Sequence, residues 1–184
     1  MTARLFAAVV PPPDVVAELE RFLEPRRGAD PSLHWTLPTS WHITCAFLPA
    51  VADQAMDDLV EGLSAGLNGI ASFAVEVCGA GAFPDPDRAR VLWLACSQGA
   101  DELTRLAQRC RSAANRAGVT VDGAAFRPHL TLARARGVPV MRWLRVLEAL
   151  PAIGWKATDV QLIRSSALPA GAGYRTVARF HLDG

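Results

Sequence analysis

The chain has 184 residues, which is enough to bury a substantial core and favours one domain or two small lobes over a multi-domain assembly. Apolar residues make up 51% and charged residues 20% of the chain, which excludes a disordered protein. The formal net charge of +1 excludes a coat for long nucleic acid, which needs many phosphate contacts, but it allows binding of a small anion or a strand end.

In chain order, the first half of the sequence alternates strands and helices. Short apolar runs bounded by proline and glycine indicate strands, and apolar residues recurring every three or four positions indicate helices. The expected elements are a strand at 4–10, a helix at 14–23 capped by Asp14, a short extended stretch at 34–37, a strand at 41–48, a helix at 54–67 and a strand at 72–77. Residues 79–87, rich in glycine, proline and aspartate, are expected to form a loop.

The second half continues in the same way. The expected elements are a strand at 90–96, a helix at 101–117 ended by Gly118, a strand at 126–134, a helix at 140–150, and strands at 155–163 and 174–182 joined by residues 168–173. Each half therefore holds helices and one strand with a histidine. The sequence predicts a single α+β domain over residues 1–184, with two pseudo-symmetric lobes of antiparallel sheet, helices on the outer faces and a central cleft.

Two of the expected strands carry the pattern His-x-Thr, as His42-Ile43-Thr44 and as His129-Leu130-Thr131. Side chains repeat every two residues along a strand, so each histidine shares one face with its threonine. Imidazole titrates near neutral pH, so one ring can accept a proton while the other donates one. Two such strands facing each other predict displacement at phosphorus without a metal, with the threonine hydroxyls holding the non-bridging oxygens.

A third His-x-Thr, His34-Trp35-Thr36, is expected to be a loop edge, because Pro38 and the two residues after it cut its strand short. His181 lies on an ordinary alternating strand and is expected to have a structural role. The catalytic pair is therefore expected to be His42 and His129.

With both motifs in this setting, the chain resembles the two-histidine phosphoesterase superfamily, and within it the bacterial RNA 2′,3′-cyclic phosphodiesterases, also called 2′-5′ RNA ligases. The resemblance covers nearly the whole chain. Besides the two motifs it includes Arg4-Leu5-Phe6, the stretch 88–94 and the stretch 174–180. It implies hydrolysis of a terminal 2′,3′-cyclic phosphate to a 2′-phosphate, and in some members reversible, ATP-independent joining of RNA through a 2′-5′ bond.

The resemblance also implies roles for single residues. His42 matches the histidine that protonates the departing ribose 3′-oxygen, and His129 matches the one that activates water. Thr44 and Thr131 match the phosphate-binding threonines. The remaining matches, to positions that contact the base or the phosphate, are Phe47 and Arg134.

Two features of the sequence complicate this match. Strict alternation places Phe47 and Arg134 on the core face, so their membership in the site requires a bulge or a strand end. The family commonly has an aromatic residue where Ala7 stands, and its loss predicts weaker stacking on a base.

The sequence gives less support to other classes of enzyme. The single lysine, Lys156, lacks the Lys-x-Asp-Gly pattern of ATP-dependent ligases, and no phosphate-binding Gly-rich loop precedes a helix. The residues around the histidines are apolar or hydroxylic, which disfavours a metallohydrolase. Another cyclic or 2′-5′ nucleotide substrate, or a non-catalytic nucleotide-binding module, remains open.

The expected setting is that of a cytoplasmic monomer. The four scattered cysteines suggest reduced core thiols, and no window approaches the ~18 consecutive apolar residues of a membrane span. We expect RNA ends or small cyclic nucleotides as partners, and neither a cofactor nor a metal.

Overall fold

Short apolar runs and amphipathic segments alternate along the chain, and they form strands and helices that bury one large apolar core and a small second cluster of Phe6, Ala8 and Ile163. The computed structural model describes residues 1–168 and 171–184. Its strands are β1 (Thr2–Val9), β2 (His34–Trp35), β3 (Ile43–Ala52), β4 (Phe73–Phe83), β5 (Ala89–Gln98), β6 (His129–Val138), β7 (Ile153–Ala157), β8 (Asp159–Leu168) and β9 (Gly171–His181). Its α-helices are α1 (Pro13–Leu23), α2 (Met56–Leu67), α3 (Ala100–Arg116) and α4 (Met141–Leu147).

The strands form one strongly curved antiparallel sheet in the order β7-β4-β5-β6-β3-β1-β8-β9, with β2 added to β6. The sheet narrows at its middle, where β3 and β6 meet through the single register pair Ile43 and Leu130. This junction divides the sheet into two antiparallel lobes, as the sequence predicts. One lobe carries His42 directly before β3, and the other carries His129 as the first residue of β6.

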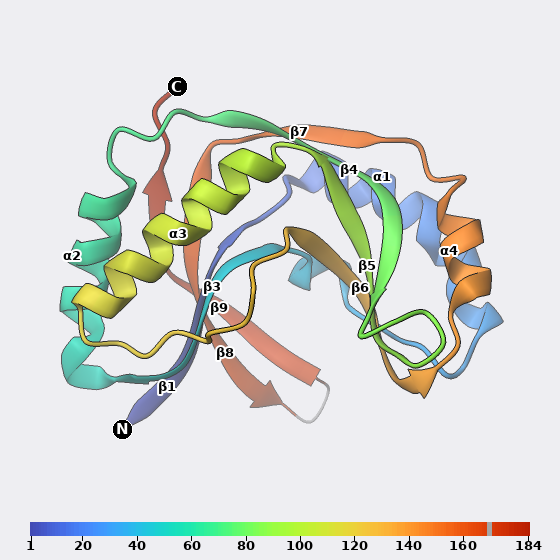
Figure 1. Cartoon of the computed structure of the whole chain (residues 1–184), viewed down its shortest axis with the longest axis horizontal. Helices are drawn as coiled ribbons and strands as arrows, with labels where there is room; N and C mark the ends of the chain where they lie inside the picture. Colours follow the sequence, from blue (N-terminus) through green and yellow to red (C-terminus); the bar gives the residue numbers. More distant parts are fainter. Residues whose placement is uncertain (169–170) are drawn as a thin grey trace.

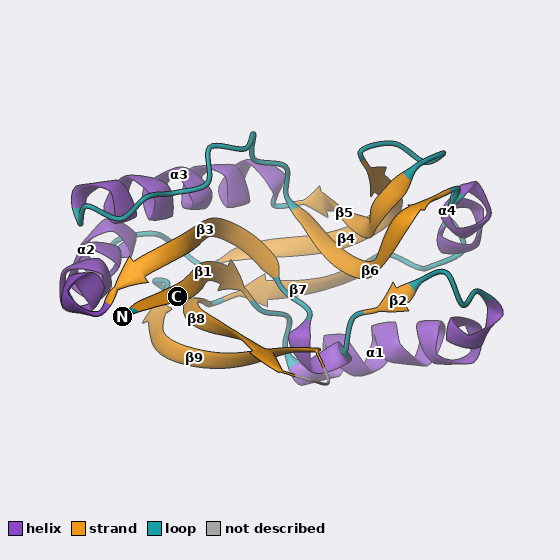
Figure 2. Cartoon of the chain, turned by 90° about the horizontal axis from the view of Figure 1, so that it is seen from below, coloured by secondary structure: helices purple, strands orange, loops and turns teal. Residues whose placement is uncertain are grey.

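Helices cover the outer side of each lobe (Figures 1 and 2). Helices α2 and α3 pack on each other and on the lobe of β3, while α1 and α4 pack on the lobe of β4 to β7. The lobes are not the two successive halves of the chain, because α1 and β2 belong to the second lobe and β8 and β9 return to the first. The chain therefore crosses between the lobes several times.

Three local predictions are wrong. Asp14 does not cap α1, which starts at Pro13 after the N-cap residue Pro12, so the Asp14 carboxylate lies in the first turn. The segment 79–87, expected to be a loop, belongs to β4 as far as Phe83. Gly79, with φ of 74°, lies at a bulge between Val77 and Ala80, and the strand continues beyond it. The expected strand at 155–163 is divided at Thr158 into two strands, β7 and β8. The reason is a change of partner: β7 pairs with β4, whereas β8 pairs with β1.

The predicted end of the helix at 101–117 agrees with the structure. Gly118 has φ of 70° and directly follows Ala117, the C-cap residue of α3. The connection expected at 168–173 falls partly on residues 169 and 170, which lie outside the described residues. All four cysteines are within the described part and are free thiols there. Cys45 and Cys110 are buried, as predicted for core thiols, whereas Cys78 and Cys96 are half-buried. None of the helices in that part is long and apolar enough to cross a lipid bilayer.

Candidate active site

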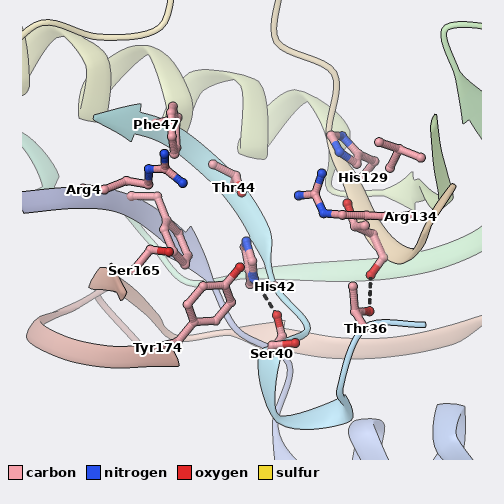
Figure 3. Close-up of a pocket in the computed structure, with 13 residues that line it drawn as sticks. Arg4, Thr36, Ser40, His42, Thr44, Phe47, His129, Arg134, Ser165 and Tyr174 are labelled. Atoms are coloured by element: carbon pink, nitrogen blue, oxygen red, sulfur yellow. Dashed lines mark hydrogen bonds between the residues drawn. The ribbon is translucent and has the colours of Figure 1, made fainter. Parts of the chain in front are cut away.

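A cleft of about 480 Å³ lies between the two lobes, over the junction of β3 and β6. Figure 3 shows His42, which directly precedes β3, and His129 of β6 on the two sides of the cleft, with Arg4 and Phe47 on the His42 side and Arg134 beside His129. The lining residues are Arg4, Phe6, Thr36, Ser40, His42, Thr44, Phe47, Val91, His129, Thr131, Arg134, Ser165 and Tyr174. All six site residues predicted from the sequence are thus brought together in one cleft.

The two catalytic candidates are held in the same way. The Nδ1–H of His42 donates to the backbone carbonyl of Ser40 at 2.7 Å, and the Nδ1–H of His129 donates to that of Arg127 at 2.7 Å. Because a carbonyl only accepts, Nδ1 must carry the proton in both rings. Each neutral imidazole therefore keeps Nε2 free as the basic nitrogen.

A bulge in β3 brings Phe47 into the cleft. The ladder with β1 skips Cys45, which lies between the pairs formed by Thr44 and Ala46. Cys45 and Ala46 are both buried, so the alternation restarts and Phe47 returns to the face of Thr44. Phe47 lines the cleft, which meets the condition that strict alternation imposed.

The second histidine strand repeats this device. The ladder of β6 with β5 skips Leu132, which lies between the pairs formed by Thr131 and Ala133. Leu132 and Ala133 are both buried, and the exposed Arg134 returns to the face of Thr131. The two lobes therefore present an equivalent set of positions: a histidine, a threonine two residues later and a further contact residue five residues after the histidine.

The side chains of two threonines line the same cleft as the histidines. Thr44 and Thr131 line the cleft, and neither hydroxyl has a hydrogen-bond partner among the residues that the structure describes. A hydroxyl facing an open cleft can donate to an anionic oxygen. The two hydroxyls are thus free to bind a phosphate.

Aromatic rings surround both imidazoles. Phe6 stacks on His42 with ring centroids 4.5 Å apart, and Tyr174 meets the same ring edge-on at 5.5 Å. On the other side, Phe83 meets His129 edge-on at 5.0 Å, and the Trp93 ring lies 5.9 Å from it. Sequence reasoning missed these four roles, although the stretches 4–6, 88–94 and 174–180 that carried the family resemblance contain Phe6, Trp93 and Tyr174.

The prediction drawn from Ala7 is wrong. Ala7 is fully buried and faces the apolar core, whereas its neighbour Phe6 lines the cleft. An aromatic residue at position 7 would therefore point away from a bound base. The alanine removes no stacking surface from this cleft.

The cleft is electrostatically suited to an anion. Arg4 and Arg134 line it, and no carboxylate is found among its described lining residues. Both arginines are exposed, so each can contact a ligand at the cleft mouth. The lining predicts a phosphate ligand.

Burial makes both imidazoles weak bases in the free protein. Burial, together with the nearby charges of His129 and Arg134, lowers the pKa of His42 to about 4, against the opposing effect of the hydrogen bond to Ser40. Burial also lowers the pKa of His129 from 6.5, helped by the charge of Arg127. The two rings influence each other's ionisation, as a coupled pair does.

The alternative candidates lie elsewhere. His34 is exposed on β2, opposite Arg134 in register, and is not among the residues lining the cleft. His181 is exposed at the end of β9, and Lys156 is exposed on β7. Within residues 1–168 and 171–184, no three histidine, cysteine, aspartate or glutamate side chains gather closely enough to hold a metal ion.

Comparisons with known proteins agree on one family. The model of the 2′-5′ RNA ligase superfamily matches residues 11–168. The RNA 2′,3′-cyclic phosphodiesterase of Aeropyrum pernix is 30% identical over 142 residues, which cover 75% of this chain and 80% of that protein. That of Aquifex aeolicus is 28% identical over 154 residues, 82% of each chain. The apo structure of E. coli LigT superimposes with a TM-score of 0.78 at 25% identity, over 100% of this chain and 99% of that one.

Proposed function

Because the chain belongs to the 2′-5′ RNA ligase superfamily, whose named relatives here are cyclic phosphodiesterases, we propose that it hydrolyses the terminal 2′,3′-cyclic phosphate of RNA to a 2′-phosphate. The observation that carries this proposal is the matched pair of imidazoles. Both rings are fixed through Nδ1 to a carbonyl two residues earlier, and both line one cleft with a free threonine hydroxyl.

The reaction requires two proton transfers around one phosphorus atom. The Nε2 of His129 accepts a proton from water as the water oxygen attacks phosphorus. The bond between phosphorus and the ribose 3′-oxygen then breaks, and the protonated Nε2 of His42 donates its proton to that oxygen. The 2′-oxygen keeps the phosphate.

The remaining cleft residues hold the substrate in this reaction. The hydroxyls of Thr44 and Thr131 donate to the non-bridging oxygens, where negative charge accumulates in the transition state. Phe47 and Arg134 contact the base or the phosphate from either side. A 5′-hydroxyl in the place of water would join two RNA strands through a 2′-5′ bond with the same groups.

Product analysis tests the proposal directly. An oligoribonucleotide ending in a 2′,3′-cyclic phosphate is incubated with the protein, and the product is compared with 2′- and 3′-phosphate standards by chromatography. We expect only the 2′-phosphate, at a rate that EDTA does not change. A 3′-phosphate would assign the 2′-oxygen as the leaving group, and inhibition by EDTA would indicate metal catalysis. A second sample containing a 5′-hydroxyl RNA measures joining.

The lowered pKa values predict how hydrolysis depends on pH. The reaction needs one imidazole protonated and the other neutral, and both pKa values in the free protein lie below the ordinary 6.5. We therefore expect kcat/KM to follow a bell-shaped profile with its maximum below pH 6.5. A bound anionic phosphate raises both pKa values, so the maximum of kcat should lie at higher pH than that of kcat/KM. A maximum of kcat/KM above pH 7 would contradict the assignment.

A further inference from the structure

The third His-x-Thr of the sequence supplies a residue that the proposed mechanism does not use. Thr36 directly follows β2 and lines the cleft, as Figure 3 shows. Its backbone N–H donates to the carbonyl of Leu132 at 2.9 Å. Its hydroxyl donates to the carbonyls of Leu132 and Thr131, at 2.9 Å and 3.1 Å, and accepts from the indole Nε1–H of Trp41 at 2.9 Å.

These contacts fall on the part of β6, at residues 131 and 132, where regular pairing with neighbouring strands is interrupted. On the β5 side, the bulge skips Leu132. On the other side, β2 pairs with β6 only through His34 and Trp35, and β3 pairs with it only at Leu130. The stretch between these pairs therefore has no regular strand partner on that edge, and Thr36 supplies its hydrogen bonds instead.

The other contact of Thr36 leads to the first histidine. Trp41 is 2% exposed and immediately precedes His42. Its indole N–H has Thr36 as the acceptor, and a buried N–H is costly to leave without one. One hydroxyl thus joins the residue before His42 to the residues two and three positions after His129.

This bridge matters because the two histidine strands meet directly at only one register pair. We propose that Thr36 is a positioning residue, whose hydroxyl sets the placement of the His42 imidazole relative to the His129 strand. The proposal rests on the proposed function for its kinetic consequence. The hydroxyl of Thr36 has one proton, which it already donates to backbone carbonyls, so it does not donate to a phosphate.

Substitution to valine isolates the hydroxyl. Thr36→Val keeps the shape and the backbone N–H bond to Leu132 but removes both the acceptor of Trp41 and the donor to the carbonyls. Since small misplacements of reacting groups lower rates by ~10²-fold, we expect kcat to fall by about this factor with little change in KM. Thr36→Ser retains the hydroxyl and should restore most of the activity. Thr39→Val, at an exposed hydroxyl in the same segment, is the matched control and should be unaffected.

Imidazole titration by NMR gives a readout that does not depend on turnover. The chain has four histidines, so each ring can be assigned by substitution. In Thr36→Val, loosening of the bridge admits water, and the pKa of His42 should rise from about 4 toward 6.5, whereas Thr36→Ser and Thr39→Val leave it unchanged. Thermal unfolding of each variant is measured first, and all rates are compared at one temperature at which every variant is folded.

The outcomes separate this inference from the proposed function. Normal kcat and normal titration in Thr36→Val would overturn the positioning role, as would a rise in KM alone, which indicates direct substrate contact. Loss of activity without rescue by Thr36→Ser would overturn it too. If the unsubstituted protein does not hydrolyse the cyclic phosphate, the proposed function fails, and the titration alone decides the role of Thr36.

Discussion

Alanine at His42 or at His129 is expected to lower kcat for cyclic phosphate hydrolysis by ~10²- to 10⁴-fold, because each substitution removes one of the two proton-transfer groups. In the proposed mechanism the two imidazoles act on the same phosphorus atom as a unit. The double variant should therefore be little slower than the slower single variant, rather than showing the product of both effects. Steady-state kinetics on a 2′,3′-cyclic nucleotide measures all three variants.

Two histidines of the same chain provide matched controls. His34 and His181 are both exposed and outside the cleft, so alanine at either position should leave kcat unchanged. Glutamine at His42 retains volume beside Phe6, which stacks on that ring, and guards against loss by misfolding. Retention of more than about a tenth of the activity in His42→Ala or His129→Ala would refute the catalytic pair. A non-catalytic nucleotide-binding module would show no turnover in any of these proteins.

The second large effect is expected at the threonines. Thr44→Val and Thr131→Val should each lower kcat by ~10²- to 10³-fold, because each removes one donor to the charge that develops on phosphate oxygen. Neither hydroxyl has a partner in the described part of the protein, so valine leaves no orphaned group behind. Thermal unfolding should therefore be nearly unchanged, and the loss is attributable to the substrate interaction.

Serine at either position tests this interpretation. Thr44→Ser and Thr131→Ser keep the hydroxyl and should recover most of the rate. A loss seen only in KM would instead indicate that the hydroxyls bind substrate and transition state equally. Equal loss in the serine and valine variants would assign the effect to the methyl group and would contradict the hydrogen-bonding role.

Two equivalent bulges bring side chains from both lobes of the one sheet into the cleft. Each lobe contributes a histidine strand with a bulge at the same distance from its histidine, next to Cys45 in one lobe and Leu132 in the other. A bulge restarts the alternation of side chains without ending the strand. This is why Phe47 and Arg134, five residues after their histidines, lie in the cleft.

Interactions between residues close in the sequence were sufficient to predict the histidine motifs, the helices and the two-lobed architecture. A period of two along a strand puts His42 with Thr44, and His129 with Thr131, whatever the strands pair with. Apolar periodicity likewise located the four α-helices that the described residues form, with boundaries shifted by a few residues. The two-lobed antiparallel architecture followed from the repeated strand motif and agrees with the observed sheet.

Other features depend on which strands become neighbours, and a single sequence does not contain that information in readable form. The bulges that admit Phe47 and Arg134 exist only relative to the register of β1 and β5. The rings around the histidines, and the bridge from Thr36 to Trp41, join segments by long-range contacts. Backbone alternation and apolar period are properties of neighbouring residues, whereas register and cross-strand contacts are properties of the folded sheet. The sequence alone therefore determined the catalytic candidates, and the tertiary structure decided what surrounds and positions them.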